Sequence, residues 1–467
     1  MTGPPIFETF EEKMRRARAS RAAIETFRRY WERVRNGETG LIPSSAIRPV
    51  LELPDAEILG RRAAETGRKA LDRLVVIKLN GGLGTSMGLE KAKSLLPVRD
   101  GLTFLDLIVR HVLRSRERTG ARLPLLLMNS FRTEADTLRH LERYPSLPVD
   151  GLPLGFLQHR VPRIDAATLE PLSWPERPEL EWCPPGHGDL YLALAESGLL
   201  DRLLELGYRW AFVSNADNLG AAVSETILGH MVLAGHDFLM EAADRTPADR
   251  KGGHLAMLPG GRLVLRESAQ CPPEELETFQ NVDRYRYFNT NNLWIDLEAL
   301  RKLIDTSGGL LILPTIINHK TADPRDPSTP PVIQLETAMG TAISVFERSG
   351  AVRVARNRFS PVKTTDDLLA VRSDAYVLTD DARVVLAPSR DEPPSITLDP
   401  EHYRLVDRFD VRFPEGPPSL ILCRSLTVHG NVTFGPGVIV RGDVIVEASR
   451  TATLRAGAVL EGTVRIP

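Results

Sequence analysis

Residues 74–98, LVVIKLNGGLGTSMGLEKAKSLLPV, constrain the fold of this chain more than any other stretch. They begin with a short run of branched apolar residues that stops at Asn80 and Gly81, a pattern that predicts a buried strand with an abrupt end. The glycines that follow allow a sharp turn and leave backbone N–H groups free to approach a base or a phosphate. Lys91 and Lys93 come next, within reach of negative charge. We therefore expect a ligand at the carboxyl end of this strand.

Two well-known phosphate-binding loops do not fit this stretch. A Walker A loop needs a glycine, four further residues and then Gly-Lys-Ser or Gly-Lys-Thr, and no glycine here begins that spacing. The dinucleotide-binding fingerprint fails as well, because after Gly82 and Gly84 its third glycine would fall at Met87. Both classes of site are therefore excluded.

Strands and helices alternate after the glycine loop. Apolar runs predict strands at 124–130, 154–159, 209–220, 237–243 and 261–267, and a helix is predicted at 104–118. This alternation predicts an α/β fold with a doubly wound, mixed but mainly parallel, Rossmann-like sheet covered on both faces. Ligands of such sheets lie across the carboxyl ends of the strands, where Asn80, Asn129, Gln158 and Asn215 fall.

The two ends of the chain differ from this central part. Residues 6–35 place apolar side chains at helical spacing among many charges, which predicts one or two amphipathic helices. Near the carboxyl end, Leu426, Val432, Val438 and Val444 are six residues apart, the repeat of one face of a left-handed parallel β-helix. A β-sandwich fragment is the alternative. We divide the chain into a helical segment (1–70), an α/β domain (71–386), a linker (387–418) and a β-helix (419–467).

Composition excludes several functional classes. The 59 basic and 61 acidic residues nearly balance, so nothing indicates a nucleic-acid partner or an anionic membrane surface. The three cysteines, Cys183, Cys271 and Cys423, are odd in number and far apart, which argues against a disulfide framework and a zinc site and favours a reducing, cytoplasmic location. The first thirty residues are too charged for a signal peptide, and no apolar run approaches the ~18 residues of a membrane span.

Two polar loops carry candidate phosphate-binding and metal-binding residues. His187 lies between glycines in WCPPGHGDLY, residues 182–191, directly before a helix that should begin at Asp189. A histidine there can donate a hydrogen bond to phosphate beside the positive helix end, although it could also be a structural cap. Asp217 ends a buried strand in FVSNADNLG, and a carboxylate at that place suits magnesium beside nucleotide phosphates. Capping of the next helix is the alternative for Asp217.

Four later stretches share this polar character. Gly253 in RKGGHL allows close backbone approach, and Asn289 and Asn291 in YFNTNNLWIDL supply the donors and acceptors that sugar hydroxyls need, unless they form a plain turn. Glu336 in VIQLETAMG should open a helix, where it could also be a partner of the helix dipole. Lys363 directly precedes a helix N-terminus, which the dipole disfavours, so an anion such as phosphate is expected beside it.

The glycine loop and two of the later stretches carry a resemblance to one enzyme family. KLNGGLGTSMG, PPGHGD and PVKTTDDL make the chain resemble eukaryotic-type UTP-glucose-1-phosphate uridylyltransferases, and motifs of that family follow in order from Lys78 to Leu368. The resemblance implies a nucleotidyltransferase domain at 71–386. It also implies a magnesium-dependent enzyme that converts UTP and glucose 1-phosphate into UDP-glucose and pyrophosphate. The sugar phosphate would attack the α-phosphorus directly, in line with the departing pyrophosphate.

The resemblance also implies roles for individual residues. Charge on the phosphates would be countered by Lys93, Lys363 and His187, with Mg²⁺ on Asp217, which could also lie near the ribose. The nucleotide would contact Leu79, Asn80, Gly81, Gly82, Met128, Gln158, Gly186 and Asp217. Together with Asn215, which the resemblance places at the sugar, the expected sugar-binding residues are Gly253, Asn289, Asn291 and Glu336.

One departure from the family pattern leaves alternatives open. Family members read G-x-x-G-P-K-S after the glycine loop, whereas this chain reads GLEKAKS, with Lys91 and Ala92 in place of Gly-Pro. Lys91 could compete with Lys93 for the same phosphate. The alternatives are the same chemistry on galactose 1-phosphate or N-acetylglucosamine 1-phosphate, and a nucleotide-binding scaffold without turnover. The exposed edge of the β-helix could mediate homo-oligomerisation, and a hexapeptide acyltransferase that uses His429 is a weak alternative for this segment.

Overall fold

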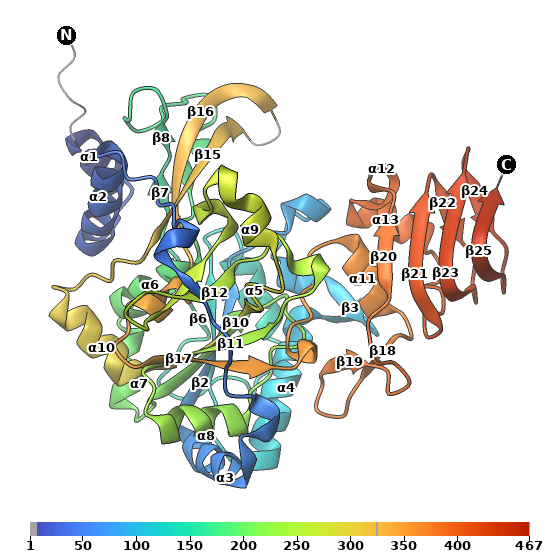
Figure 1. Cartoon of the computed structure of the whole chain (residues 1–467), viewed down its shortest axis with the longest axis horizontal. Coiled ribbons are helices and arrows are strands. Elements are labelled where there is room, and N and C mark those ends of the chain that lie inside the picture. Colours follow the sequence, from blue (N-terminus) through green and yellow to red (C-terminus); the bar gives the residue numbers. More distant parts are fainter. Residues whose placement is uncertain (1–6, 324–325, 467) are drawn as a thin grey trace.

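A mixed β-sheet forms the centre of the computed structural model, which describes residues 7–323 and 326–466 (Figure 1). The expectations for residues 1–6 and 467 lie outside this part. The described sheet has ten strands and runs β1-β12-β14-β10-β2-β5-β6, with β13 beside β12, β11 beside β14, and β17 beside β11. Its strands are β1 (Arg48–Pro49), β2 (Leu74–Asn80), β5 (Leu125–Asn129), β6 (Gly155–Leu157), β10 (Trp210–Asn215), β11 (Phe238–Asp244), β12 (His254–Met257), β13 (Leu263–Arg266), β14 (Tyr287–Asp296) and β17 (Ser349–Val354).

The directions of the strands confirm a mixed sheet and correct the expectation that it is mainly parallel. The strands β10, β2, β5 and β6 are parallel, as is the β11–β17 pair. The long strand β14, which contains the asparagine-rich run, is antiparallel to both β10 and β11, and β12 is antiparallel to its neighbours. Five of the nine pairs in this sheet are therefore antiparallel, and β14 separates the parallel group of β10, β2, β5 and β6 from the parallel pair of β11 and β17.

Helices cover both faces of the sheet, as expected. Alternate side chains of β2 point to opposite faces, so that Val75 and Ile77 join one buried cluster and Leu74 and Val76 another. The first cluster includes α6 (Leu190–Glu196), α7 (Leu199–Glu205) and α10 (Leu297–Thr306). The second includes α4 (Phe104–Thr119) and α8 (Glu225–Ala234), against which α3 (Gly60–Ala70) packs. A strand buried on both faces explains the unbroken apolar run that begins the glycine motif.

A helical hairpin near the amino terminus packs on a long β-hairpin beside the main sheet (Figure 1). It consists of α1 (Glu8–Arg16) and α2 (Arg21–Arg35), whose Phe10, Phe27 and Trp31 are buried against Ile333 and Leu335. The hairpin partner is formed by β15 (Thr315–Asp323) and β16 (Asp326–Thr337), with β8 (Ile164–Asp165) along its edge.

The prediction that a helix begins at Glu336 is wrong. Glu336 lies within β16 instead and pairs with Ile316 of β15, and a short 3₁₀ turn begins only at Met339. The apolar run before Glu336 therefore belongs to an antiparallel ladder that the local sequence did not reveal.

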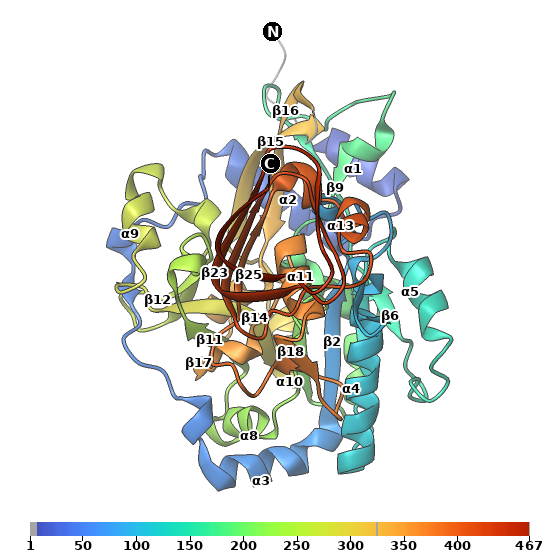
Figure 2. The same cartoon turned by 90° about the vertical axis from the view of Figure 1, so that its right-hand side faces the viewer.

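The carboxyl-terminal region forms two parallel sheets that project from the α/β domain (Figures 1 and 2). The larger sheet consists of β20 (Ser395–Leu398), β21 (Cys423–His429), β23 (Ile439–Ala448) and β25 (Val459–Ile466); the smaller consists of β22 (Val432–Phe434) and β24 (Ala452–Leu454). The aliphatic side chains spaced six apart, from Leu426 to Val444, are all buried in the same cluster. The six-residue period thus marks the side chains that point inward.

Residues 387–418, for which the sequence predicted a linker, contain β20 and two short helices, α12 (Pro400–Tyr403) and α13 (Val406–Arg412). Tyr403 and Phe409 are buried against the parallel sheets, and a methyl carbon added at Gly88 of the glycine loop would lie 3.2 Å from Leu405. The carboxyl-terminal region therefore contacts the loop that the sequence marks as the ligand site. Within the described ranges, no helix is both long and apolar enough to cross a lipid bilayer.

Candidate active site

A cavity of about 300 Å³ opens at the carboxyl ends of β2, β5, β6 and β10. Every residue that was predicted to contact the nucleotide lines it, together with Lys93, His187 and Asn215. The full lining is Leu79, Asn80, Gly81, Gly82, Lys93, Ser94, Met128, Gln158, Pro184, Gly186, His187, Asn215, Ala216 and Asp217. Segments separated by more than a hundred residues therefore meet at the edge where the sheet topology predicts a ligand.

Two glycines in the cavity wall are required by close contacts. A methyl carbon added at Gly81 would lie 2.9 Å from the side-chain amide of Gln158. One added at Gly186, whose φ of 82° favours glycine, would lie 2.4 Å from the carbonyl oxygen of Thr337. The Gly82 position is open instead, and its carbonyl oxygen accepts a hydrogen bond of 3.0 Å from Lys93 N, which closes the glycine loop.

Asn80 contributes its backbone to the cavity, while its side chain has a structural role. The Asn80 Nδ2 group donates to Asn129 Oδ1 at 2.7 Å and to Thr137 Oγ1 at 2.9 Å, and the side chain is buried. These bonds fasten the end of β2 to the end of β5 and to helix α5 (Glu134–Leu141). The backbone from Leu79 to Gly82 is thereby held in place before any ligand arrives.

Lys93 and Asp217 form an ion pair inside the cavity. The Lys93 Nζ atom lies 2.6 Å from Asp217 Oδ2, and both side chains retain some exposure. A lysine ammonium is a compact point charge that can exchange one anionic partner for another. The pair therefore places one cation and one carboxylate where a phosphate and a metal ion would each find an opposite charge.

His187 is held in one tautomer. Its Nδ1 atom accepts a hydrogen bond of 3.0 Å from Met339 N, which leaves the proton on Nε2. Burial lowers the pKa of His187 to about 4, so the ring is neutral at pH 7. His187 can therefore donate a hydrogen bond but does not add a positive charge, which refines the expectation that it counters phosphate charge.

Lys363 lies beside the cavity rather than in its lining. Its side chain is exposed, with Nζ 5.8 Å from the centre of the Phe359 ring. The preceding residue is fixed, because Val362 N donates a hydrogen bond of 3.1 Å to Asp217 O. The segment that carries Lys363 is thus attached to the segment that carries Asp217.

The sugar candidates fall into separate groups. Asn215 lines the cavity, whereas Gly253, Asn289 and Asn291 form a cluster of their own in which Asn289 Nδ2 donates to Asn291 Oδ1 at 2.8 Å and Asn289 N donates to Gly253 O at 3.4 Å. Glu336 is paired with Lys320 at 3.2 Å, and its Cβ would lie 3.1 Å from a methyl carbon added at Gly186.

Sequence reasoning missed Glu267, which lies beside this cluster. A methyl carbon added at Gly253 would lie 2.4 Å from Glu267 Oε2, so the carboxylate covers the glycine directly. Burial raises the pKa of Glu267, while the positive charge of Lys363 opposes that shift. Nothing in the sequence around Glu267 distinguishes it from an ordinary surface charge at the end of a strand.

A buried polar hub behind the cavity was missed as well. Glu241 of β11 accepts two hydrogen bonds of 2.6 Å from the guanidinium of Arg358, one of 3.0 Å from Asn292 and one of 2.9 Å from Trp294. The Glu241 side chain is fully buried. All four lone-pair directions of this carboxylate therefore have a donor, as a buried charge requires.

Asn218 joins this hub to the cavity. Its Oδ1 atom accepts from Ser360 N at 2.8 Å, and its Nδ2 group donates to Arg358 O at 3.2 Å and to Asn292 Oδ1 at 3.2 Å. Asn218 directly follows Asp217, and Ser360 precedes Lys363 by three residues. The hub thus sets the spacing between the loops that carry Asp217 and Lys363.

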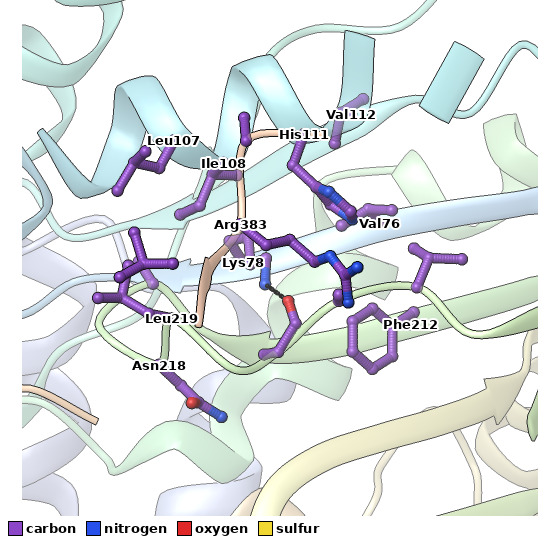
Figure 3. Close-up of a pocket in the computed structure, with 16 residues that line it drawn as sticks. Val76, Lys78, Leu107, Ile108, His111, Val112, Phe212, Asn218, Leu219 and Arg383 are labelled. Atoms are coloured by element: carbon purple, nitrogen blue, oxygen red, sulfur yellow. Dashed lines mark hydrogen bonds between the residues drawn. The ribbon is translucent and has the colours of Figure 1, made fainter. Parts of the chain in front are cut away.

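A second cavity lies on the other side of β2, between α4 and β10 (Figure 3). Lys78 Nζ donates to Ser214 Oγ at 2.6 Å and to Ala221 O at 2.9 Å, and burial lowers the pKa of Lys78 to about 7. The space is about 30 Å³, which is room for about one water molecule. This cavity is therefore too small for a nucleotide or a sugar.

Comparisons with known proteins agree with this architecture. The family model described as UTP-glucose-1-phosphate uridylyltransferase matches residues 24–441. The protein of that name from Solanum tuberosum is 43% identical, covering 90% of this chain and 84% of its own length. The one from Saccharomyces cerevisiae is 42% identical, covering 84% and 78%.

Solved structures give the same result over the full chain. The crystal structure of a mutant of the UDP-glucose pyrophosphorylase from Leishmania major, in complex with UDP-glucose, has a TM-score of 0.92 and 44% identity, covering 100% of both chains. A Trypanosoma brucei structure described as a UDP-glucose phosphorylase has a TM-score of 0.91 and 45% identity, covering 99% of both. The chain belongs to the UTP-glucose-1-phosphate uridylyltransferase family.

Proposed function

We propose that this protein transfers the uridylyl group of UTP to glucose 1-phosphate, forming UDP-glucose and pyrophosphate. The observation that carries the proposal is that every residue expected to contact the nucleotide lines one cavity, in a chain similar over its whole length to a protein crystallised with UDP-glucose. Neither the same chemistry on another sugar nor a scaffold without turnover has a comparable observation in its favour.

In this proposal the base lies against the glycine loop. Uracil would contact the backbone from Leu79 to Gly82, with Met128, Gln158 and Gly186 around it. The side-chain amide of Gln158 lies directly over Gly81, and an amide can both donate to and accept from the polar edge of a pyrimidine. The firmly bonded strand ends would thus present a rigid surface to the base.

The reaction would be an in-line displacement. A phosphate oxygen of glucose 1-phosphate forms a bond to the α-phosphorus of UTP, and the bond from that phosphorus to the bridging oxygen of pyrophosphate breaks. Lys93 would leave Asp217 to contact phosphate, His187 would donate its Nε2 proton as a hydrogen bond, and Lys363 would approach from the adjoining segment. Catalysis would therefore consist of positioning and charge neutralisation.

Asp217 fits a magnesium ion. Mg²⁺ takes one or two carboxylates from the protein and leaves its other positions to phosphate and water, so a single carboxylate in the cavity wall suffices. The described residues contain no group of three or more acidic, histidine or cysteine side chains that could hold a metal by themselves. When bound, the ion would neutralise phosphate charge.

The sugar would extend from Asn215 toward the cluster of Gly253, Asn289 and Asn291, with Glu336 on the side of Gly186. Glu267 would add a carboxylate that accepts from sugar hydroxyls. For the carboxyl-terminal region we propose a left-handed β-helix, supported by its parallel strands and six-residue period, and a homo-oligomer through its open edge. Three buried, free cysteines support a reducing, cytoplasmic location.

The test is pyrophosphate release from purified protein with UTP, Mg²⁺ and glucose 1-phosphate. ATP, CTP, GTP and dTTP replace UTP in control reactions, and galactose 1-phosphate and N-acetylglucosamine 1-phosphate replace the sugar at equal concentration. Release with UTP and glucose 1-phosphate only is the expected result. Binding of UTP without release under any metal condition would contradict the proposal and favour the scaffold.

A further inference from the structure

His159 is a partly buried histidine held between two carboxylates directly beside the cavity. Its Nδ1 atom lies 2.8 Å from Asp189 Oδ1 and its Nε2 atom lies 2.7 Å from Glu196 Oε2. With a carboxylate on each ring nitrogen, both nitrogens must be donors, so the ring is an imidazolium. His159 directly follows Gln158 in the chain but does not itself line the cavity.

Asp189 holds the main chain at this point as well as the ring. Its Oδ2 atom accepts a hydrogen bond of 2.7 Å from His159 N, while Oδ1 bonds to the ring. Asp189 lies two residues after His187, in the loop that forms the opposite wall of the cavity. One carboxylate therefore ties the Gln158 segment to the Gly186 and His187 segment.

Glu196 extends the connection to the amino-terminal hairpin. It is the last residue of α6, and its Oε1 atom accepts a hydrogen bond of 2.5 Å from Ser20 Oγ, the N-cap of α2. The His159 imidazolium thus connects the two loops of the cavity wall with the end of α6. Through Glu196 it is also connected to the start of α2. Charge-assisted hydrogen bonds of this kind are stronger than neutral ones.

The electrostatics keep the ring charged over a wide pH range. Burial disfavours the imidazolium, but the hydrogen bonds and charges of Asp189 and Glu196 outweigh burial and raise the pKa of His159 to about 10. Tyr30 of α2 is the other titratable side chain that lines the small space beside the ring, and burial raises its pKa to about 12. The neighbours that titrate with His159 are therefore the two carboxylates.

We propose that His159 is a positioning residue for the nucleotide base. By bridging Asp189 and Glu196 it fixes Gln158 over Gly81 and sets the width of the slot between Gln158 and Gly186. This inference rests on the proposed function, because it assigns His159 to the base subsite of that reaction.

The first test is His159→Gln, which keeps one hydrogen bond and removes the charge. KM for UTP and the Kd for UTP from calorimetry should rise about tenfold, and the preference for UTP over CTP should fall, while kcat at saturating UTP stays within about twofold. The matched control is His230→Gln, a partly buried histidine on α8, which should leave all of these values unchanged. Equal UTP affinity in His159→Gln and the wild type, with matching thermal unfolding, would overturn the proposal.

The second test uses pH and a variant that preserves packing. Glu196→Gln removes one of the two negative charges, so the pKa of His159 falls. Because the bridge exists while His159 is protonated, KM for UTP in the wild type should rise only as pH approaches about 10, and in Glu196→Gln it should rise at lower pH. Superimposable pH profiles would contradict the proposal. Wild-type protein without turnover would instead defeat the proposed function itself.

Discussion

Two ion pairs within this molecule flank the same loop and differ in solvent exposure and in the number of hydrogen bonds that they make. Lys93 and Asp217 meet through one contact of 2.6 Å inside the cavity, with side-chain exposures of 15% and 24%. Arg358 and Glu241 meet through two parallel contacts of 2.6 Å behind it, and the carboxylate of Glu241 has 0% exposure and two further donors. The loop at residues 216–222 lies between them.

The difference shows which charges can take part in binding. A point-charge lysine with a single, partly exposed partner can release it when a phosphate arrives, because solvent and ligand both compensate the loss. The guanidinium of Arg358 cannot release the buried, fully hydrogen-bonded carboxylate of Glu241 in this way. Separation of the two would leave the carboxylate charge uncompensated in a low dielectric. We therefore assign the first pair to ligand exchange and the second to the fixed frame that holds Asp217 and Lys363.

The largest effect is expected from breaking the first pair on its cationic side. Lys93→Ala should lower kcat by about a thousandfold while UTP still binds, since loss of one donor to a transition-state anion commonly costs 10²–10³ in rate. Single-turnover kinetics and UTP calorimetry measure the two quantities separately. Turnover close to that of the wild type would show that Lys93 is not catalytic.

Breaking the second pair should act on stability instead. Glu241→Ala leaves the guanidinium of Arg358, which is only 16% exposed, without its ion-pair partner and should lower the free energy of unfolding by about 3–5 kcal/mol. Asp217→Ala in the more exposed pair should lower it by less, about 1 kcal/mol. Urea denaturation of both variants gives the comparison. Similar losses of stability in the two variants would remove the distinction between exchangeable and fixed pairs.

A smaller effect is expected from replacing Asn218, which connects the loop of the Lys93–Asp217 pair to the Arg358–Glu241 pair. Asn218→Ala removes the bonds to Ser360 N and Arg358 O and should cost about 1–3 kcal/mol of stability, with a roughly tenfold fall in kcat because the spacing of Asp217 and Lys363 loosens. The matched control is Asn281→Ala, which removes an exposed turn cap and should not change kcat. An unchanged kcat in Asn218→Ala would separate the hub from catalysis.

The smallest effect should come from an ion pair that takes part neither in ligand exchange nor in the frame that holds Asp217 and Lys363. Arg301 and Asp305 pair on the exposed face of α10. Arg301→Ala should change the free energy of unfolding by no more than about 0.5 kcal/mol and leave kcat and KM unaltered. A loss of 2 kcal/mol or more would show that exposure alone does not separate weak from strong pairs in this protein.

The same contrast explains what could be predicted from the sequence. The glycine loop and Asp217 were recognisable as a candidate site because a strand end, a glycine turn and a charge stand together in the chain, and the parallel topology then brings the strand ends together. The family resemblance added the contacts of Leu79 to Gly82 and the choice of Lys93 over Lys91. Leu426 to Val444 were recognisable as inward-facing for a similar reason, since their six-residue period is local.

Interactions between residues that are distant in the chain could not be predicted from the sequence. Glu241 lies in a strand and Arg358 ends a short 3₁₀ turn (Arg356–Arg358), and neither segment indicates that they meet. The antiparallel direction of β14 and the strand conformation of Glu336 depend on neighbouring strands, which override local preference. Glu267 and His159 likewise acquire their surroundings only from the tertiary fold.

The hub of Glu241 and Arg358 also has a consequence for how the chain is made. Glu241 leaves the ribosome 117 residues before Arg358, and Asn292 and Trp294 emerge between them. Until Arg358 appears, closing the sheet around Glu241 would bury a carboxylate that has two hydrogen-bond donors but no counter-charge, at a cost of several kcal/mol. We therefore expect the order of synthesis to delay completion of the α/β domain until the segment that also carries Lys363 is available, so that the folded core and the proposed phosphate-binding residues arise together.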